Sequence, residues 1–309
     1  MNVKKQIDIK SWIAYDENTD KFSKFLLEAP FSVCYKITQK CNYNCAHCIS
    51  ASSKISSYGL PTEKVKEVFK KIKNAGVLRL DITGGEPYER EDINELLEYA
   101  VNIGLEVVIT TNGSLLKDED IRLLSKYKIF TQISIDGSKE TNDKLRGEGA
   151  FDKAVQAIKK LNNANVPVRI NCTIQQRNIE AIDEIVDVAR MLNVNNIYII
   201  VACAQGRANR VRESICLNEI EERVLRNKVL QLRSNMDINI KILDFKQYSH
   251  SCVLIETNGD FISQSWDEND CINTGNIFES DLKELWIKSN AFDHARHLLQ
   301  YIRHPVLYV

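Results

Sequence analysis

The sequence of 309 residues has no long apolar run, no surplus of one charge and no low-complexity segment. No stretch approaches the roughly 18 to 20 apolar residues of a membrane-spanning helix. Residues 1–12, MNVKKQIDIKSW, lack the apolar core of a secretory signal. The 41 basic and 42 acidic residues give a formal net charge of −1, so electrostatics alone do not favour nucleic acid as a partner. We therefore expect a cytoplasmic protein with no membrane or nucleic-acid partner.

Cysteine, in contrast, occurs at nine positions. Because cytoplasmic thiols stay reduced, we expect no disulfide framework, and a tight group of cysteines then indicates metal binding or catalysis. Hydrophobic residues make up 44% of the chain and charged residues 27%, the composition of an ordinary globular protein with a large core. The cysteines are Cys34, Cys41, Cys45, Cys48, Cys172, Cys203, Cys216, Cys252 and Cys271.

Strand-like and helix-like segments alternate between about residues 31 and 201. Six strands that alternate with six helices imply parallel βαβ units, and six units are fewer than the eight of a closed barrel. We predict an α/β fold, a partial (three-quarter) (β/α)6 TIM-like barrel, with a doubly wound sheet as the alternative. In either fold the site lies at the carboxyl ends of the strands. The predicted strands are 31–37, 78–83, 106–111, 131–136, 166–174 and 196–201.

The last of the six helices is predicted near 218–233. Its apolar residues are Ile220, Val224, Leu225 and Leu232. As in the other predicted helices, we expect such residues to form the face that packs on the core.

The pattern changes after about residue 238. Residues 252–266 predict a hairpin around Asn258–Gly259, because Asn-Gly is the preferred two-residue turn. Helices are predicted near 279–289 and 290–302. The chain is accordingly divided into an N-terminal extension (1–30), a barrel (31–237) and a small C-terminal extension (238–309).

The segment CNYNCAHC contains three cysteines, Cys41, Cys45 and Cys48, directly after the first predicted strand. Three thiolates can hold a [4Fe–4S] cluster and leave one iron without a protein ligand. An open coordination position distinguishes a catalytic metal site from a closed structural one. The alternative is a structural zinc site completed by His47 or by a distant cysteine.

With this spacing of three and then two residues, the sequence resembles the radical S-adenosylmethionine (radical SAM) superfamily. The resemblance implies that the amino and carboxylate groups of SAM bind the open iron. It also implies that an electron from the reduced cluster, supplied by a donor such as flavodoxin or ferredoxin, cleaves SAM. The resulting 5′-deoxyadenosyl radical then abstracts a hydrogen atom from the substrate, while the protein orients and shields the cofactor.

Short motifs at the next strand ends extend the resemblance. TGGEP contains Gly84, Gly85 and Glu86, which match the motif that contacts the SAM amino group in that family. Asn112, in TTNG, is expected to line the same pocket. Residues 201–208, VACAQGRA, resemble the adenine-side turn. Each motif alone is also compatible with ordinary turn chemistry.

The later strands supply the remaining expected SAM contacts. The resemblance places Ser134 and Asp136, in SIDG, near the ribose hydroxyls. It pairs Arg146 with the SAM carboxylate, for which a guanidinium is well suited, and puts Thr173 and Ile174 near adenine. These matches follow the family order from residue 31 to about 208.

The C-terminal segment resembles the extension called SPASM, or its shorter twitch form, with a reduced set of cysteines. Gln264 stands where that extension has a cysteine, and only Cys252 and Cys271 lie nearby in sequence, with Cys203 and Cys216 further away. We expect no complete auxiliary cluster. Cys252 is either a small packed side chain or a donor of a hydrogen atom to a substrate radical. Without an auxiliary electron acceptor, a redox-neutral outcome such as epimerisation is favoured.

Three functions follow as hypotheses. The first is a radical SAM enzyme that modifies a ribosomally made peptide, since the SPASM/twitch branch is rich in peptide maturases. The 30 residues before the barrel are too few for a leader-binding domain, so a separate peptide-recognition protein is expected. The second is a radical epimerase or dehydrogenase of a small natural-product sugar such as an aminoglycoside. The third is a zinc-stapled, non-catalytic binding protein.

Overall fold

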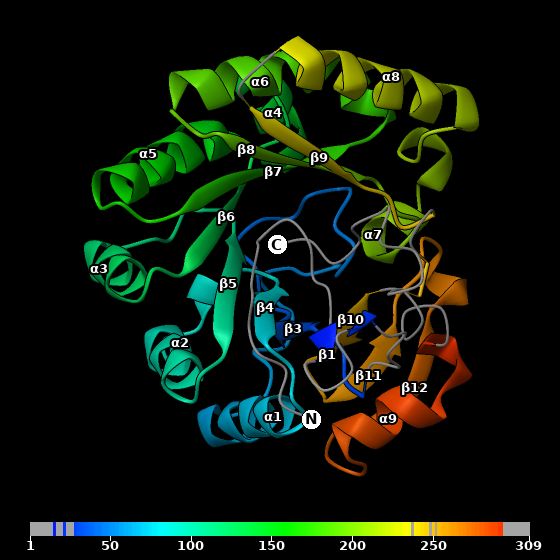
Figure 1. Ribbon diagram of the computed structural model, residues 1–309. Helices are drawn as coiled ribbons and strands as arrows, with labels where there is room; N and C mark the ends of the chain where they lie inside the picture. The colour runs from blue at the N-terminus through cyan, green and yellow to red at the C-terminus, as the bar shows by residue number, and fades with distance from the viewer. Residues whose placement is uncertain are drawn as a thin grey trace.

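The computed structural model describes residues 15–16, 21–22, 28–235, 238–246, 249–250 and 252–292. Its centre is one ten-stranded sheet that curves around an interior, with helices on the outer face (Figure 1). The strand order is β12-β11-β10-β3-β4-β5-β6-β7-β8-β9, so the sheet is open and ends at β12 and β9. An open, partial barrel is therefore confirmed.

Seven consecutive strands of the sheet are parallel, and each pairs with the next strand in the chain. An additional strand, β10, pairs in parallel with the opposite edge of β3 and continues through two antiparallel strands. A separate antiparallel pair joins β1 (Tyr15–Asp16) to β2 (Lys21–Phe22). The parallel strands are β3 (Ser32–Thr38), β4 (Arg79–Gly84), β5 (Glu106–Thr111), β6 (Phe130–Ser134), β7 (Val168–Ile174), β8 (Asn196–Val201) and β9 (Asn239–Leu243), followed by β10 (Val253–Ile255), β11 (Asp260–Ser263) and β12 (Ile272–Asn276).

The helices connect these strands and cover the outside of the curved sheet (Figure 1). None of the helices in the described part of the chain is both long and apolar enough to cross a membrane. The α-helices are α1 (Thr62–Asn74), α2 (Ile93–Asn102), α3 (Asp118–Tyr127), α4 (Lys139–Arg146), α5 (Ala150–Asn163), α6 (Ile182–Met191), α7 (Gly206–Asn209), α8 (Glu219–Asn235) and α9 (Leu282–Lys288). Short 3₁₀ helices are η1 (Pro87–Glu89), η2 (Gln176–Ala181), η3 (Arg212–Ser214), η4 (Glu268–Asp270) and η5 (Asn290–Phe292).

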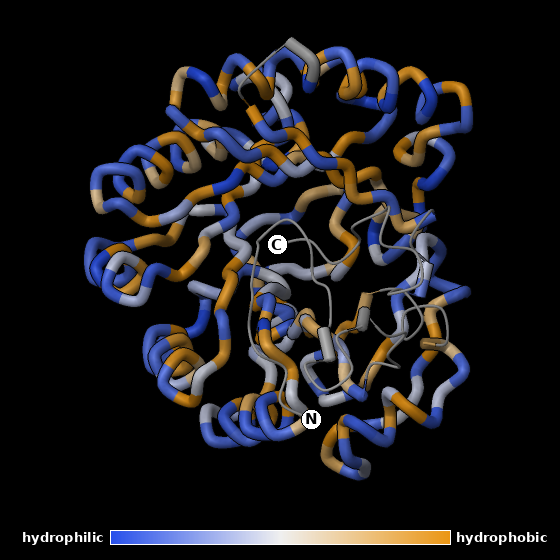
Figure 2. Tube along the Cα trace, viewed as in Figure 1, coloured by the Kyte–Doolittle hydropathy of each residue, from blue (hydrophilic) through white to orange (hydrophobic). Residues whose placement is uncertain are grey.

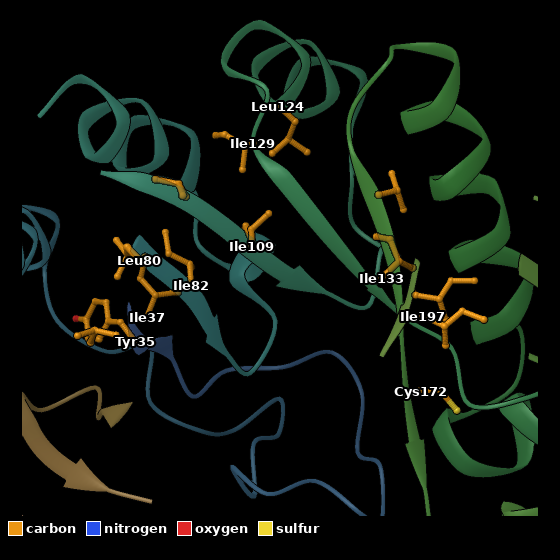
Figure 3. Packing of buried hydrophobic residues seen from close by; sticks show 14 of the residues in the cluster. Tyr35, Ile37, Leu80, Ile82, Ile109, Leu124, Ile129, Ile133, Cys172 and Ile197 are labelled. Carbon is orange, nitrogen blue, oxygen red and sulfur yellow. The ribbon is translucent and has the colours of Figure 1, made fainter. Parts of the chain in front are cut away.

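Alternation along the strands separates an apolar outer face from a polar inner face, because successive side chains point to opposite sides of a sheet. Figure 2 shows this alternation of hydrophobic and hydrophilic residues along the sheet. The outer-facing residues pack under the helices and are fully or nearly fully buried; Figure 3 shows Tyr35, Ile37, Leu80, Ile82, Ile109, Ile133 and Ile197 among them. The opposite positions, which face the interior of the barrel, include Cys34, Lys36, Arg79, Asp81, Gln132, Ser134, Arg169, Asn171, Thr173, Tyr198 and Lys241.

The six strands predicted from sequence are confirmed as β3 to β8, and the predicted hairpin is confirmed as β10 and β11. The strand β9 is not predicted from sequence: it extends the parallel sheet past residue 238. The division into 31–237 and 238–309 stays a prediction, although the sheet itself continues across it. Most of the N-terminal extension and of the helix predicted near 290–302 lies outside the described residues.

The buried face of α8 differs from the predicted one. Leu225 and Val229 are each 1% exposed, and Leu232 is also buried. Ile220 and Val224, which the sequence pattern grouped with them, are 73% and 57% exposed. The spacing 225, 229, 232 follows a single helix face, and the two exposed residues lie beside that face.

Leu225→Ala is expected to reduce the free energy of unfolding by about 2–4 kcal/mol, because it leaves a cavity under α8. The neighbouring Val224→Ala changes an exposed side chain and is expected to cost no more than about 0.5 kcal/mol. Urea unfolding of both variants measures the difference. Equal costs would contradict the assignment of the buried face.

Candidate functional site

The three clustered cysteines lie in one long irregular segment between β3 and α1, residues 39–61, called the cysteine loop below. Loops of this length inside a compact domain are uncommon and usually functional. Cys41, Cys45 and Cys48 are all half-buried free thiols. Burial raises the pKa of Cys41 to about 12 and also raises that of Cys45.

The end of β4 holds the start of the cysteine loop through its backbone. The N–H groups of Gly85 and Glu86 donate to the carbonyls of Thr38 and Lys40, at 2.7 and 2.8 Å. The approach is so close that a Cβ at Gly84 would lie 2.2 Å from the Thr38 oxygen, and one at Gly85 would lie 2.0 Å from the Lys40 oxygen. These glycines therefore allow the contact between β4 and the loop, in addition to their predicted place in the motif that contacts the SAM amino group.

Arg90, which follows η1, joins the two ends of the loop. Its side chain is fully buried, and Nη1 donates to the carbonyls of Ile37, Tyr58 and Leu60 at 3.0–3.3 Å. The rest of the guanidinium binds both carboxylate oxygens of Asp92, at 2.8 and 2.6 Å. The sequence analysis did not identify Arg90. This residue lies three positions after the TGGEP motif and belongs to no recognised pattern.

Glu86 links β4 to β5 below the loop. Its carboxylate is completely buried and accepts hydrogen bonds from Thr111 Oγ1 at 2.6 Å and from the backbone N–H groups of Asn112 and Tyr88 at 2.7 and 3.1 Å. Burial raises its pKa to about 7, against the opposing effect of these donors. In this arrangement Glu86 orders the ends of two strands.

Asn112 continues this connection to the cysteine loop. Its Nδ2 donates to Asn42 Oδ1 at 2.9 Å, and Asn42 in turn donates to Ser114 Oγ at 2.8 Å. The Asn112 Oδ1 accepts from the Ser114 hydroxyl at 2.6 Å. The residue next to Cys41 is therefore fixed by the end of β5.

Asp136, at the end of β6, is the most highly connected charge in the site. Its carboxylate is fully buried and pairs with Arg146 through Nε at 2.7 Å and Nη2 at 3.0 Å. It also accepts from the Thr173 N–H at 2.8 Å and lies 3.3 Å from His47 Nε2. Burial opposes ionisation, but Arg146 and then His47 hold the pKa of Asp136 below its usual value.

His47, between the second and third cysteines, is neutral in this setting. Burial lowers its pKa to about 4, although Asp136 acts in the opposite direction. The Gln175 Nε2 lies 3.1 Å from His47 Nδ1. An amide nitrogen can only donate, so Nδ1 accepts from Gln175 and Nε2 carries the proton, 3.3 Å from an Asp136 oxygen. Both ring nitrogens lie against protein partners, which disfavours His47 as the fourth ligand of the zinc alternative.

The segment after β8 holds the far side of the loop. Arg207 donates from Nε to the Cys45 carbonyl at 2.9 Å and from Nη1 to the Ser52 carbonyl at 2.6 Å. Its backbone N–H donates to the Cys48 carbonyl at 3.0 Å. Sequence reasoning expected this segment on the adenine side of a ligand and missed the role of Arg207.

The remaining predicted positions lie at the same end of the barrel. Ser134 is half-buried at the end of β6, Thr173 is half-buried near the end of β7, and Ile174 is fully buried. The structure thus brings the predicted residues of β4 to β7 around the cysteine loop. Their contacts with SAM stay predictions.

The donor set fits a cluster better than a single ion. A zinc ion bound at about 2.3 Å needs sulfur atoms that converge on one point. Across the ranges that the structure describes, no three His, Cys, Asp or Glu side chains are arranged in that way. Three thiols in one anchored loop suit a multi-iron cluster, in which each cysteine binds a different iron.

A second group of cysteines gathers near the C-terminal hairpin. Burial raises the pKa of the Cys203 thiol, and Cys216, Cys252 and Cys271 raise it further, so all four lie in one region of the fold. Their separation in sequence is therefore not a separation in space. Cys252 is half-buried, and burial raises its pKa to about 12, with a further contribution from the inner-facing Asp81.

Comparison with known proteins agrees with this arrangement. Residues 35–198 match the model of the Radical SAM superfamily. An AdoMet-dependent heme synthase of Methanosarcina barkeri is 28% identical over 303 residues, covering 88% of this chain and 86% of that protein. A mycofactocin maturase of Mycolicibacterium smegmatis is 35% identical over 51% of this chain, which spans only 41% of the maturase.

Among solved structures, Streptococcus suis SuiB bound to its precursor peptide SuiA has a TM-score of 0.72. The match covers 88% of this chain and 67% of SuiB, at 21% identity. Likeness at this level of identity shows the shared fold.

Gly85→Ala is expected to destabilise the protein by at least about 2 kcal/mol, because the new Cβ meets the Lys40 carbonyl. Gly149→Ala is the control: no atom lies within 4 Å of its Cβ position, and only the left-handed backbone opposes it, at about 1–2 kcal/mol. Chemical unfolding compares the two. If Gly85→Ala is at least as stable to unfolding as Gly149→Ala, the cysteine loop can shift away from β4 at little cost in free energy.

Asp136→Asn is expected to cost about 3–5 kcal/mol, because Arg146 would keep a buried charge without its partner. The control Asp152→Asn breaks an exposed pair with Lys139 and is expected to cost about 0.5 kcal/mol or less. The folded-state pKa of Asp136 lies below the usual 3.8, so its contribution is complete above that pH and is lost as the pH falls. Unfolding from pH 7 to pH 2 should show a flatter acid limb in Asp136→Asn.

Proposed function

Because the chain belongs to the radical SAM superfamily, we propose that it binds one [4Fe–4S] cluster through Cys41, Cys45 and Cys48 and uses SAM to abstract a hydrogen atom from a peptide substrate. The convergence of five strand ends on the loop that carries these thiols supports the proposal. When bound, the cluster and SAM supply the radical chemistry. Membership of the radical SAM superfamily argues against the zinc-stapled, non-catalytic binding protein.

The residues of the chain itself hold the cysteine loop in a fixed position. Three carbonyls held by Arg90 at the ends of the cysteine loop, and two held by Arg207 near its middle, fix the loop before any cofactor arrives. Such preorganisation avoids an ordering cost at the moment of binding. Ser134 and Thr173, half-buried at adjacent strand ends, present polar atoms to the proposed SAM site.

Arg146 is proposed to turn towards the SAM carboxylate while it keeps its contact with Asp136. A guanidinium has five N–H donors, and the contacts of Arg146 with Asp136 use Nε and Nη2. A second carboxylate can therefore be bound without breaking the first pair. The proposed role of Asp136 changes with this, from a ribose contact to a residue that positions Arg146 and His47.

A peptide is proposed as the substrate on two grounds. The Mycolicibacterium relative is a maturase, and SuiB was solved with a precursor peptide. An electron donor such as flavodoxin or ferredoxin, and a separate peptide-recognition protein, are proposed partners in a cytoplasmic setting. A short precursor encoded beside this protein, converted in a SAM-dependent way, would support the substrate class. The natural-product sugar stays an untested alternative.

A second candidate substrate is a tetrapyrrole. The match to the AdoMet-dependent heme synthase extends over nearly the full length of both proteins, which the maturase match does not. Incubation with a carboxylated porphyrin, SAM and a reductant, followed by mass spectrometry, separates the two candidates.

The outcome for the substrate is proposed to be redox-neutral, with Cys252 as a hydrogen-atom donor whose thiyl radical is returned to the thiol by one electron from the proposed electron donor and one proton from solvent. Cys252 precedes β10 and lies within electrostatic range of Cys34 and Asp81, both on the inner face of the barrel. Its raised pKa keeps the thiol protonated, the form that can donate a hydrogen atom. Deuterium incorporated from solvent at a substrate carbon, and lost in Cys252→Ala, would support this role.

Alanine at Cys41, Cys45 or Cys48 is expected to abolish 5′-deoxyadenosine formation and to remove most cluster iron after anaerobic reconstitution. Each variant loses one of only three protein ligands. Iron and sulfide are counted per chain, and 5′-deoxyadenosine is measured after addition of SAM and dithionite. Wild-type protein that binds about four irons but forms no 5′-deoxyadenosine would refute the proposed activity.

Cys203→Ala and Cys271→Ala are the matched controls, since they remove thiols of the second group. With one cluster per chain, both keep the wild-type iron count. About eight irons in the wild type, reduced to about four in both controls, would instead show an auxiliary cluster at the second group.

A further inference from the structure

Ile55 is the most exposed large apolar side chain in the described part of the chain. It is 96% exposed, whereas the next, Ile220 on α8, is 73% exposed. Ile55 belongs to the cysteine loop, on which Ile49 and Tyr58 are also exposed. Single exposed apolar residues are common on protein surfaces, so exposure alone assigns Ile55 no role. Its role follows from how the loop holds it.

A tight turn, Ser53 to Ser56, holds Ile55 out from the loop. The Ser56 N–H closes the turn by donating to the Ser53 carbonyl at 3.2 Å. The Ser56 hydroxyl oxygen accepts from the Ser53 N–H at 3.0 Å and lies 2.9 Å from the Ser53 hydroxyl. Lys54 and Ile55 are the two central residues, and both are exposed. The turn therefore presents a positive charge and an aliphatic side chain in a fixed place, which lowers the entropy cost of binding a partner.

Short backbone hydrogen bonds join this turn to the cysteines. The Cys41 N–H donates to the Ser53 carbonyl at 3.0 Å, and the Ala51 N–H donates to the Cys48 carbonyl at 3.3 Å. An electron passes through bonded and hydrogen-bonded contacts more readily than across an open gap. The turn is therefore a short route from the surface to two of the three proposed cluster ligands.

The cysteine loop also carries positive charge only. It contains two lysines, Lys40 and Lys54, and no aspartate or glutamate. Lys40 pairs with Glu89 at 3.2 Å, whereas Lys54 forms no ion pair with any residue that the structure describes. Glu91 borders the loop at Tyr58, whose hydroxyl accepts from the Glu91 N–H at 2.8 Å. The exposed cation at the turn favours a partner with an acidic surface.

The proposed reaction supplies the reason for a partner, because each cleavage of SAM takes one electron from outside the chain. The buried side of the cysteine loop faces the strand ends, where His47 contacts Asp136 and where SAM and the substrate are proposed to bind. The turn faces solvent and stays open to a protein that brings the electron. Transient redox complexes use small interfaces, which the exposed part of one loop can provide.

We propose that the turn is the docking site of the electron donor, an electron-transfer protein with an acidic surface such as a flavodoxin or ferredoxin. Ile55 is the apolar anchor of the interface, and Lys54 orients the partner. The proposal rests on the proposed function and gives its electron a point of entry. A few residues carry most of the energy of an interface, and a charge beside them mainly raises the association rate. The donor loses one electron and the cluster gains it, so no bond forms or breaks at the turn.

The first test measures binding and needs neither SAM nor substrate. The anaerobically reconstituted protein is titrated calorimetrically with oxidised flavodoxin and, separately, with oxidised ferredoxin. Ile55→Asp is expected to weaken binding of the carrier at least about tenfold, because it replaces the apolar anchor by a charge of the partner's sign. Lys54→Glu is expected to weaken binding several-fold at low salt and less as the salt concentration rises. The matched control is Ile220→Asp, an exposed isoleucine on α8, which should bind the carrier as the wild type does.

The second test separates docking from chemistry. Dithionite is a small reductant that needs no docking surface, so with dithionite Ile55→Asp and the wild type should form 5′-deoxyadenosine at equal rates. With the reduced carrier at a concentration below saturation, Ile55→Asp should be at least about tenfold slower. Equal iron counts in the two proteins show that the cluster site is intact in the variant.

Equal binding and equal carrier-driven rates in Ile55→Asp and the wild type would overturn the proposal, as would a wild type that binds neither carrier. If Ile55→Asp is reduced normally but converts a peptide more slowly, the turn serves peptide recognition instead. A dimer of this chain that Ile55→Asp disperses in size-exclusion chromatography would assign the turn to self-association and would also overturn the proposal. Failure of the proposed function is separate, since the wild type would then form no 5′-deoxyadenosine even with dithionite.

Discussion

The structure depends on one constraint: a long segment without helix or strand must have its buried polar groups satisfied by other parts of the chain. The cysteine loop meets this constraint with partners from five different strand ends. Arg90 takes three carbonyls at the two ends of the loop, and Arg207 takes two near its middle. Removing any one partner leaves buried acceptors without donors, so the loop and the open edge of the barrel form one cooperative unit.

In this arrangement, residues of the recognised motifs also have a structural role. Glu86, Asn112 and Asp136 were predicted as ligand-binding positions, and each also makes short polar contacts within the protein. The two roles agree physically, because a group that binds a cofactor accurately must first be held in place. Asp136 shows the principle: it fixes Arg146, whose remaining donors are then available in a defined direction.

The sequence predicted six parallel strands, the partial barrel with a doubly wound sheet as its alternative, and the end of the barrel where the site lies, because the alternation of strands and helices and right-handed crossovers leave few choices. It did not predict β9, whose five residues NIKIL are too short to stand out after α8. Arg90 and Arg207 were missed because binding carbonyl groups far along the chain leaves no local pattern. The exposed position of Ile220 on α8 was missed because periodicity defines a helix face but not its exact centre.

The fold tolerates polar residues on the inner face of the barrel because its apolar core lies elsewhere. The core that stabilises the protein lies between the sheet and its outer helices, where the outward side chains of β3 to β8 are almost completely buried. Inward side chains do not pack under the outer helices and can carry charge even where they are buried, as Arg79 and Arg169 are. The fold thus separates the layer that supplies most of its apolar burial from the layer in which polar side chains line the interior of the barrel.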